Sequence, residues 1–403
     1  MKKVLALLLA MCILFSLAAC GGSSSNGGKA SDEPKAQELP SQEPAVSGDE
    51  SQDTPPAELK EFIVGFPEAP VEVPAVLAIK INTQKVVETA GGTLKNEIFD
   101  FTPEGTVDAV EKIIANGADG VIITPSSESI IPTVLNMCEE SGVYFILSMR
   151  TIEDESIRAM CEASKYFLGC VYEDDYAAGY ALGKALYEAG ETTYALIGTA
   201  VGDTTGDTRE RGLAAAAEEF GLTCVSEVRA LAQASDAASA VESFLAAYPD
   251  LGGIIRIAST AAGDVSAICT ALEEAGKAGD VKFVTIDVDD ESAVEHFKKG
   301  TITATLGNAL SLDRLIATSI LVNAILGTPV SDKPVYICIP FPVITTADEL
   351  TMDTVYTTST NGLYPEEVIR ERLLKYFNPD VTLESILEQV DNYDLNYIAS
   401  LWE

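Results

Sequence analysis

The stretch Asn116-Gly117-Ala118-Asp119-Gly120-Val121-Ile122-Ile123 decides the fold class of this chain. Val107, Val110 and Ile114 precede it at helical spacing, and Asn116-Gly117 supplies a left-handed stop. The short apolar run that follows the stop is typical of a buried strand. Apolar strands that alternate with helices indicate a parallel sheet covered by helices on both faces.

The same alternation extends over most of the chain. We predict buried strands at residues 62–65, 94–101, 121–124, 143–147, 194–198, 222–225, 254–257, 281–286, 302–306 and 335–339. Helices are predicted between them, and the longest apolar one spans 312–326. These strands are too many for one compact sheet. We therefore predict an α/β protein with two doubly wound parallel-sheet lobes.

The N-terminus has the layout of a secretory signal. Lys2 and Lys3 precede an apolar run from Val4 to Phe15, which is shorter than the roughly 20 residues that span a bilayer. Leu17-Ala18-Ala19-Cys20 resembles the lipobox of bacterial lipoproteins, in which cleavage precedes a lipid-bearing cysteine. The resemblance predicts a signal peptide at 1–19, lipid on Cys20 and an extracytoplasmic, membrane-anchored protein. The alternative is a plain signal peptide that happens to meet a cysteine.

Residues 20–60 are rich in Gly, Ser, Pro, Glu and Asp, and such a composition predicts a disordered tether. The formal charge of the whole chain is -36, which argues against nucleic acid and anionic membrane surfaces as partners. With a single histidine, His296, metal sites of the His-His type and Ser-His-Asp catalysis are hard to assemble. We expect no metal, no cofactor and no enzymatic activity.

Six cysteines remain after Cys12 and Cys20 are assigned to the leader and the lipid. Buried thiols are one interpretation, and a Cys161–Cys170 bridge is another, because exported proteins can oxidise. The sequence cannot settle their pairing. They are Cys138, Cys161, Cys170, Cys224, Cys269 and Cys338.

Four ordered stretches carry a resemblance to a known family. They are residues 116–123, Tyr176-Ala177-Ala178-Gly179, Arg209-Glu210-Arg211-Gly212, and Thr285-Ile286-Asp287 followed by Gly300-x-x-Thr303-Ala304-Thr305-x-x-Asn308. In their order and spacing, residues 61–345 resemble type I periplasmic solute-binding proteins, and among these the ribose and galactose receptors of ABC importers. The resemblance implies a hinge of three crossings and a ligand in the cleft at the carboxyl ends of the strands, as in open α/β sheets generally.

The resemblance also implies a division of the chain. It assigns 61–172 plus 309–337 to the N-terminal lobe and 173–308 plus 338–349 to the C-terminal lobe. Residues 350–403 lie beyond the family pattern, and we assign no chemistry to this extension. Closure of the lobes over the ligand would give a form that a membrane permease reads, and ligand drives closure only through contacts made in the closed state.

Carried over by position, the family's sugar site falls on Arg150, Arg209, Asp287 and Asn308, with Phe66 and Ser259 as weaker candidates. Guanidinium and carboxylate groups of this kind suit the paired hydroxyls of a polyol. Two departures from the family pattern are clear. Met149 stands where the family has an aspartate, and Val73-Pro74-Ala75-Val76 replaces Asn-Pro-Phe-Phe.

The charge of these candidates leaves the ligand class open. Arg150 and Arg209 against Asp287 alone would leave excess positive charge, which favours an anionic ligand such as a sugar acid or a sugar phosphate. A nearby acid, Asp203 or Asp207, would remove that excess.

The leading function is a monomeric receptor that delivers a sugar or sugar-like solute to an ABC permease. Alternatives are a receptor of the same fold that signals to a sensor kinase or chemoreceptor, an amino-acid or nucleoside binder, a degenerate scaffold, and a hydrolase.

Overall fold

The computed structural model describes residues 60–70, 74–100, 102–258, 261–288, 292–357 and 361–403. The predicted signal peptide, the lipid site at Cys20 and nearly all of the tether lie outside the described residues, as does Ser259. Within the described ranges, no helix is both long and apolar enough to cross a bilayer.

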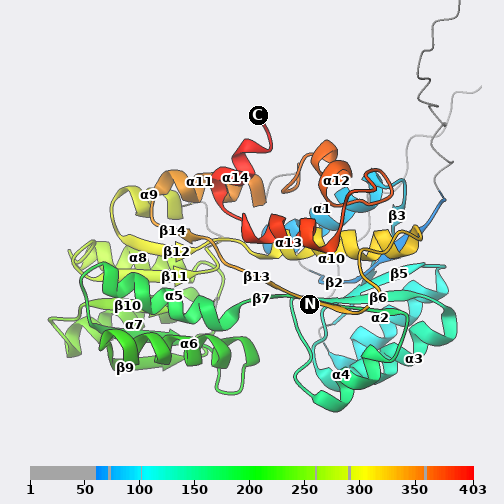
Figure 1. Ribbon diagram of the computed structural model, residues 1–403. Coiled ribbons are helices and arrows are strands. Elements are labelled where there is room, and N and C mark those ends of the chain that lie inside the picture. The colour runs from blue at the N-terminus through cyan, green and yellow to red at the C-terminus, as the bar shows by residue number, and fades with distance from the viewer. Residues whose placement is uncertain (1–59, 71–73, 101, 259–260, 289–291, 358–360) are drawn as a thin grey trace, which may run out of the picture. The chain divides into compact units, whose positions relative to one another are not determined.

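The first lobe is built on a six-stranded sheet with the order β13-β7-β6-β5-β1-β3, in which neighbouring strands are parallel (Figure 1). Its strands are β1 (Ile63–Gly65), β3 (Thr93–Leu94), β5 (Gly120–Ile123), β6 (Tyr144–Ser148), β7 (Phe167–Glu173) and β13 (Val335–Ile339). Two further short strands, β2 (Pro67–Glu68) and β4 (Glu97–Ile98), pair with each other.

Successive side chains of a strand point to opposite faces of the sheet, and here both sets are apolar. Helices therefore cover both faces. Ile122 and Ile146 pack toward α1 (Pro74–Thr89) and α10 (Leu310–Ile325). Their chain neighbours Ile123 and Phe145 pack toward the other helices. These are α2 (Pro103–Ala115), α3 (Ile131–Ser141), which follows the short 3-10 helix η1 (Glu128–Ile130), and α4 (Glu155–Glu162).

The second lobe repeats this plan with the sheet order β14-β12-β11-β10-β8-β9. Its strands are β8 (Thr193–Gly198), β9 (Thr223–Arg229), β10 (Gly253–Arg256), β11 (Lys282–Ile286), β12 (Ile302–Leu306) and β14 (Val343–Ile344), the last antiparallel to β12. The helices α5 (Asp175–Glu188) and α6 (Thr204–Phe220) cover one face. The other face is covered by α7 (Ala234–Ala247), α8 (Asp264–Glu274) and α9 (Ala293–Lys298).

The chain passes between the two sheets three times: from β7 to α5, from β12 to α10, and from β13 to β14. The first and third passages run side by side, because β7 and β13 pair up to Glu173 and Ile339, and the Asp174 N–H donates to the Ile339 carbonyl at 3.1 Å. The predicted fold class, two doubly wound α/β lobes with a three-segment hinge, is confirmed.

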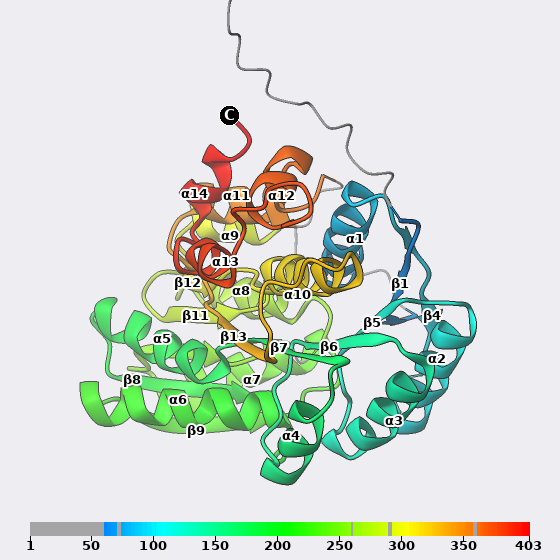
Figure 2. The ribbon, with the colours of Figure 1, turned by 45° about the vertical axis from the view of Figure 1, so that its right-hand side comes forward.

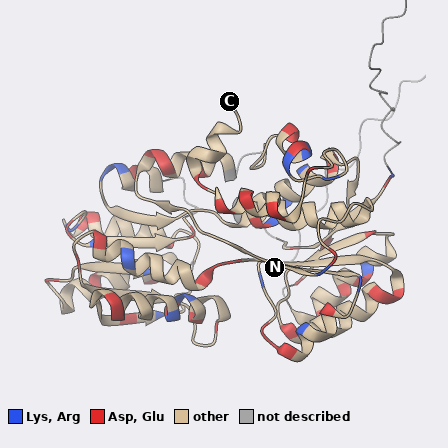
Figure 3. Cartoon of the chain, in the orientation of Figure 1, with Lys and Arg blue, Asp and Glu red and all other residues tan. Residues whose placement is uncertain are grey.

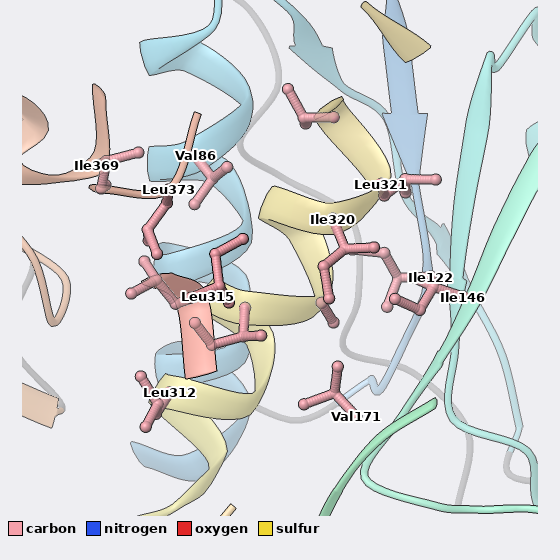
Figure 4. Close-up of a cluster of buried hydrophobic side chains, with 14 of the residues drawn as sticks. Val86, Ile122, Ile146, Val171, Leu312, Leu315, Ile320, Leu321, Ile369 and Leu373 are labelled. Atoms are coloured by element: carbon pink, nitrogen blue, oxygen red, sulfur yellow. The ribbon is translucent and has the colours of Figure 1, made fainter. Parts of the chain in front are cut away.

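The C-terminal extension joins the cores of both lobes. The helix α11 (Ala347–Thr357) leads into it from the second lobe, and it contains α12 (Glu366–Arg372), α13 (Leu383–Asp391) and α14 (Leu395–Ser400). Figures 1 and 2 place α12 and α13 on the side of α1 and α10 that faces away from the first sheet. Ile369 and Leu373 pack there on α10, across from Ile122 and Val171 (Figure 4). Leu395 belongs instead to the core of the second lobe.

The six cysteines of the described ranges form no disulfide; five of them are buried or half-buried, and Cys224 is exposed. Burial raises the pKa of Cys138, Cys161, Cys170 and Cys338 to about 12, so their reactive thiolate is scarce at neutral pH. Burial also raises the pKa of Cys224, but its side chain is the exposed one of the six, so we expect iodoacetamide to label Cys224 alone at short times in the native chain from Gly21 onward. Peptide mass spectrometry checks this, and equal early labelling of Cys138 would contradict the packing of the first lobe.

Candidate ligand-binding site

Acidic residues are spread over the helices of both lobes (Figure 3). Three arginines of the described residues are buried. Buried charges require partners. Arg256 on β10 is fully buried, and Asp264 accepts two hydrogen bonds from it, at 2.9 and 2.7 Å. This pair lies within the second lobe and is structural. The other two, Arg209 and Arg314, lie at the carboxyl ends of the strands.

Arg209 comes from the buried face of α6, and three groups hold its guanidinium. Its Nε donates to Asp175 at 2.8 Å, and its Nη1 donates to Asp287 and to the Ile257 carbonyl, both at 3.1 Å. One face of the guanidinium lies over the ring of Phe341, in the third crossing, at 5.5 Å. The orientation of Arg209 is therefore fixed from several directions.

Two glycines bring Asp175 to Arg209. A Cβ on Gly179 of α5 would lie 1.7 Å from the Arg209 carbonyl oxygen, and one on Gly212 of α6 would lie 1.9 Å from the Tyr176 carbonyl oxygen. The two helices can approach this closely only because both side chains are absent. Asp175, the first residue of α5, consequently reaches the guanidinium.

Asp287 and Met149 occupy equivalent places in the two lobes, directly after β11 and β6. Both are non-glycine residues with positive φ, 57° for Asp287 and 66° for Met149. Such backbone strain is uncommon and gathers at functional sites. The Asp287 side chain is 42% exposed, and the Met149 carbonyl accepts a hydrogen bond from Arg150 Nη1 at 2.6 Å.

Arg209 contacts Asp175 directly, and Arg150 and Asp287 lie near enough for their charges to act on its carboxylate. Burial raises its pKa, and this rise is opposed by Arg209 and by Arg150, while Asp287 adds to it. Arg150 of the first lobe and Arg209 and Asp287 of the second thus act on one carboxylate. Asp175 was not among the predicted site residues, although it directly precedes the stretch Tyr176-Ala177-Ala178-Gly179. The preceding acid, Asp174, has a different role: its carboxylate accepts the Ala177 N–H at 2.8 Å and caps α5.

The remaining candidates have other surroundings. Asn308 lies in the second crossing, where its Oδ1 accepts the Ser311 N–H at 3.0 Å and its own N–H donates to Asp353 at 3.1 Å. Phe66 is buried beneath the guanidinium of Arg314, which lies 4.9 Å from its ring centroid. Its ring is therefore covered by protein. Ser259 is outside the described residues.

Two surface pockets lie elsewhere. One, of about 410 Å³, is lined by α1 and β3, and another, of about 380 Å³, by the starts of β6 and β7 and the end of α10. Neither includes Arg150, Arg209 or Asp287. Among the residues that the structure describes, no cluster of His, Cys, Asp and Glu could hold a metal ion.

A family model described as a periplasmic binding protein domain matches residues 80–326, which is more than half of the chain. The chain therefore belongs to the periplasmic binding protein family. A search of curated proteins finds no significant match.

Solved structures show the same fold at low sequence identity. An ABC transporter periplasmic solute binding protein from Actinobacillus succinogenes 130z with bound D-allose is 22% identical, with a TM-score of 0.60 over 71% of this chain and 98% of that one. A periplasmic ribose ABC transporter protein from Conexibacter woesei DSM 14684 is 19% identical, with a TM-score of 0.61 over 75% and 98%. A solute binding protein from Bacillus halodurans C-125 with bound myo-inositol is 17% identical, with a TM-score of 0.58 over 73% and 98%.

Proposed function

We propose that this protein binds a neutral polyhydroxylated solute, a sugar or a cyclic polyol, between Arg150 of the first lobe and Asp287 and Arg209 of the second. The observation that carries the proposal is the hydrogen-bonded set of Asp175, Arg209 and Asp287 at the carboxyl ends of the second sheet, together with Arg150 just after the carboxyl end of β6 in the first lobe. Charged donors and acceptors with fixed geometry match neighbouring hydroxyl groups of one ring. The exposed carboxylate of Asp287 and the half-buried Arg150 would make the direct contacts.

The charge balance favours a neutral ligand over an anionic one. Two carboxylates, Asp175 and Asp287, accompany Arg150 and Arg209, which supports the alternative that a nearby acid removes the excess positive charge. We infer that the balancing acid is Asp175, in place of Asp203 or Asp207. Asp203 caps α6 through the Gly206 N–H, and Asp207 accepts the Gly202 N–H. An anion added to this set would bring uncompensated negative charge into the site.

Family membership and the solved relatives support the wider role. Structures of the relatives contain D-allose, D-arabinose and myo-inositol, and all three ligands are neutral and rich in hydroxyl groups. The protein would work outside the cytoplasm, anchored through lipid on Cys20 and held off the membrane by residues 20–60. In its closed form it would deliver the solute to an ABC permease.

A thermal-shift screen of the chain from Gly21 onward tests the function. The neutral panel is D-allose, D-arabinose and myo-inositol, and D-galacturonate and D-glucose 6-phosphate are the anionic controls. A ligand at 100 times its dissociation constant should stabilise the protein by about 2.7 kcal/mol. We expect at least one neutral compound, or a close stereoisomer, to do so. Stabilisation by the anions alone would reject the neutral-ligand proposal.

A further inference from the structure

Behind the candidate site, α10 holds the strand ends of the first lobe through two adjacent buried residues. Asp313 accepts hydrogen bonds from the Ser148 hydroxyl and from the Met149 N–H, the latter at 3.1 Å. Arg314 donates to the Thr124 hydroxyl at 3.0 Å and lies over Phe66. Consecutive residues of one helix therefore fix the carboxyl ends of β6, β5 and β1.

The hydrogen bond from the Met149 N–H to Asp313 lies next to the backbone group that holds Arg150. Met149 has the left-handed conformation that a non-glycine residue adopts only when its surroundings impose it. Its N–H is held by Asp313, and its carbonyl is held by the Arg150 guanidinium. The backbone of Met149 thus links the two side chains: its N–H contacts Asp313, and its carbonyl contacts Arg150.

We propose that Asp313 is a positioning residue, which holds Met149 in its left-handed turn and thereby aims Arg150 at the ligand. The part of this inference that concerns ligand rests on the proposed function, whereas the part that concerns the turn does not. Since α10 begins directly after the second crossing, the same contact ties the direction of Arg150 to the helix that leaves the hinge.

A carboxylate is a costly residue at this position, because burial disfavours its charged form. Burial raises the pKa of Asp313, although the Ser148 hydroxyl, Arg314 and the Met149 N–H favour the charged state. Glu173, at the end of β7, is also buried and interacts unfavourably with Asp313. A leucine would fill this space without that cost. What the carboxylate adds is a pair of acceptors for the β6 end and its turn.

The ligand-independent test is hydrogen exchange of the Met149 amide, measured by mass spectrometry on the peptide spanning residues 145–152. In Asp313→Ala the amide loses its acceptor, and we expect exchange at least about tenfold faster. Asp313→Asn keeps one acceptor oxygen, so the Met149 amide of this variant should exchange at nearly the rate found in the unchanged protein. Ser319→Ala is the matched control, since Ser319 is buried on α10 and its hydroxyl donates to the Leu315 carbonyl. If the alanine variant does not fold, Asp313→Leu gives the same readout.

The ligand arm is a double-mutant cycle with Arg150→Ala, followed by calorimetric titration of the neutral sugar that stabilises best. If Asp313 acts through Arg150, Asp313→Ala should weaken binding about tenfold in the unchanged background and less than twofold in the Arg150→Ala background. Equal effects in both backgrounds would overturn the positioning role. Unchanged Met149 exchange in the variants without an acceptor would overturn it even if no sugar binds, and the absence of sugar binding would count against the proposed function alone.

Discussion

Replacement of Arg209 by alanine should abolish measurable ligand binding and lower the free energy of unfolding by about 3 kcal/mol or more. The guanidinium is buried, and its removal leaves the largely buried Asp175 carboxylate without its partner at 2.8 Å. Asp287 is 42% exposed, so water compensates most of its loss. Urea unfolding and calorimetric titration with the best neutral sugar check the two effects.

Two variants show whether the effect belongs to this site. Arg209→Lys keeps the charge but cannot reach Asp175, Asp287 and the Ile257 carbonyl together, so it should recover part of the stability and little of the binding. Arg229→Ala removes another arginine that is paired with two carboxylates, Glu210 and Glu227, and should change affinity less than twofold. Unimpaired binding by Arg209→Ala would remove Arg209 from the proposed site.

Replacement of Leu373 by alanine should destabilise the protein by about 2–5 kcal/mol. Leu373 is 0% exposed in the core that α10 shares with the C-terminal extension, and its carbonyl accepts a hydrogen bond from buried Asn323 at 2.7 Å. Truncation of its side chain leaves a cavity that the surrounding helices can fill only in part. Equilibrium unfolding in urea measures the change.

The matched control is Leu387→Ala, on α13 of the same extension, where the leucine is 37% exposed. We expect this change to cost about 0.5 kcal/mol or less, because the exposed position leaves no cavity. Equal and small effects at the two leucines would mean that the extension does not form part of the first lobe's core.

The strand–helix alternation could be predicted because buried parallel strands are short and apolar, as in 121–124 and 254–257. The strand β7 (Phe167–Glu173) was missed, since Gly169 interrupts its apolar run. That glycine has φ 121°, and a Cβ there would lie 1.9 Å from the Val335 carbonyl oxygen, so the close approach of β13 requires it. The strand predicted at 94–101 is instead two strands of two residues each, β3 and β4.

The extension could have been anticipated from α10. Each residue from Ser311 to Ile325 is buried, so this helix has no face left for solvent. A helix that is buried all round needs cover on every side. The sheet and α1 cover part of α10, and the pattern therefore required a further layer. Which segment supplies that layer depends on packing over long sequence separations, which periodicity does not reveal.

The predicted site residues came from a resemblance, and the structure adds what the resemblance omitted. Arg209 and Asp287 are joined across 78 positions, and the carboxylate that balances them, Asp175, lies 34 positions before Arg209. The aspartate that the family pattern expects at Met149 is absent. The carboxylate beside that turn comes instead from Asp313, 164 positions later. Pairings of this kind depend on the tertiary fold and have no local sequence signal.

A crystal structure with the neutral sugar that gives the largest thermal shift tests the central claim most directly. We expect the sugar at the carboxyl ends of both sheets, with Arg150 on one side and Asp287 and Arg209 on the other within hydrogen-bond distance. A sugar bound only in the surface pocket along α1 and β3, with these three side chains free of it, would contradict the account.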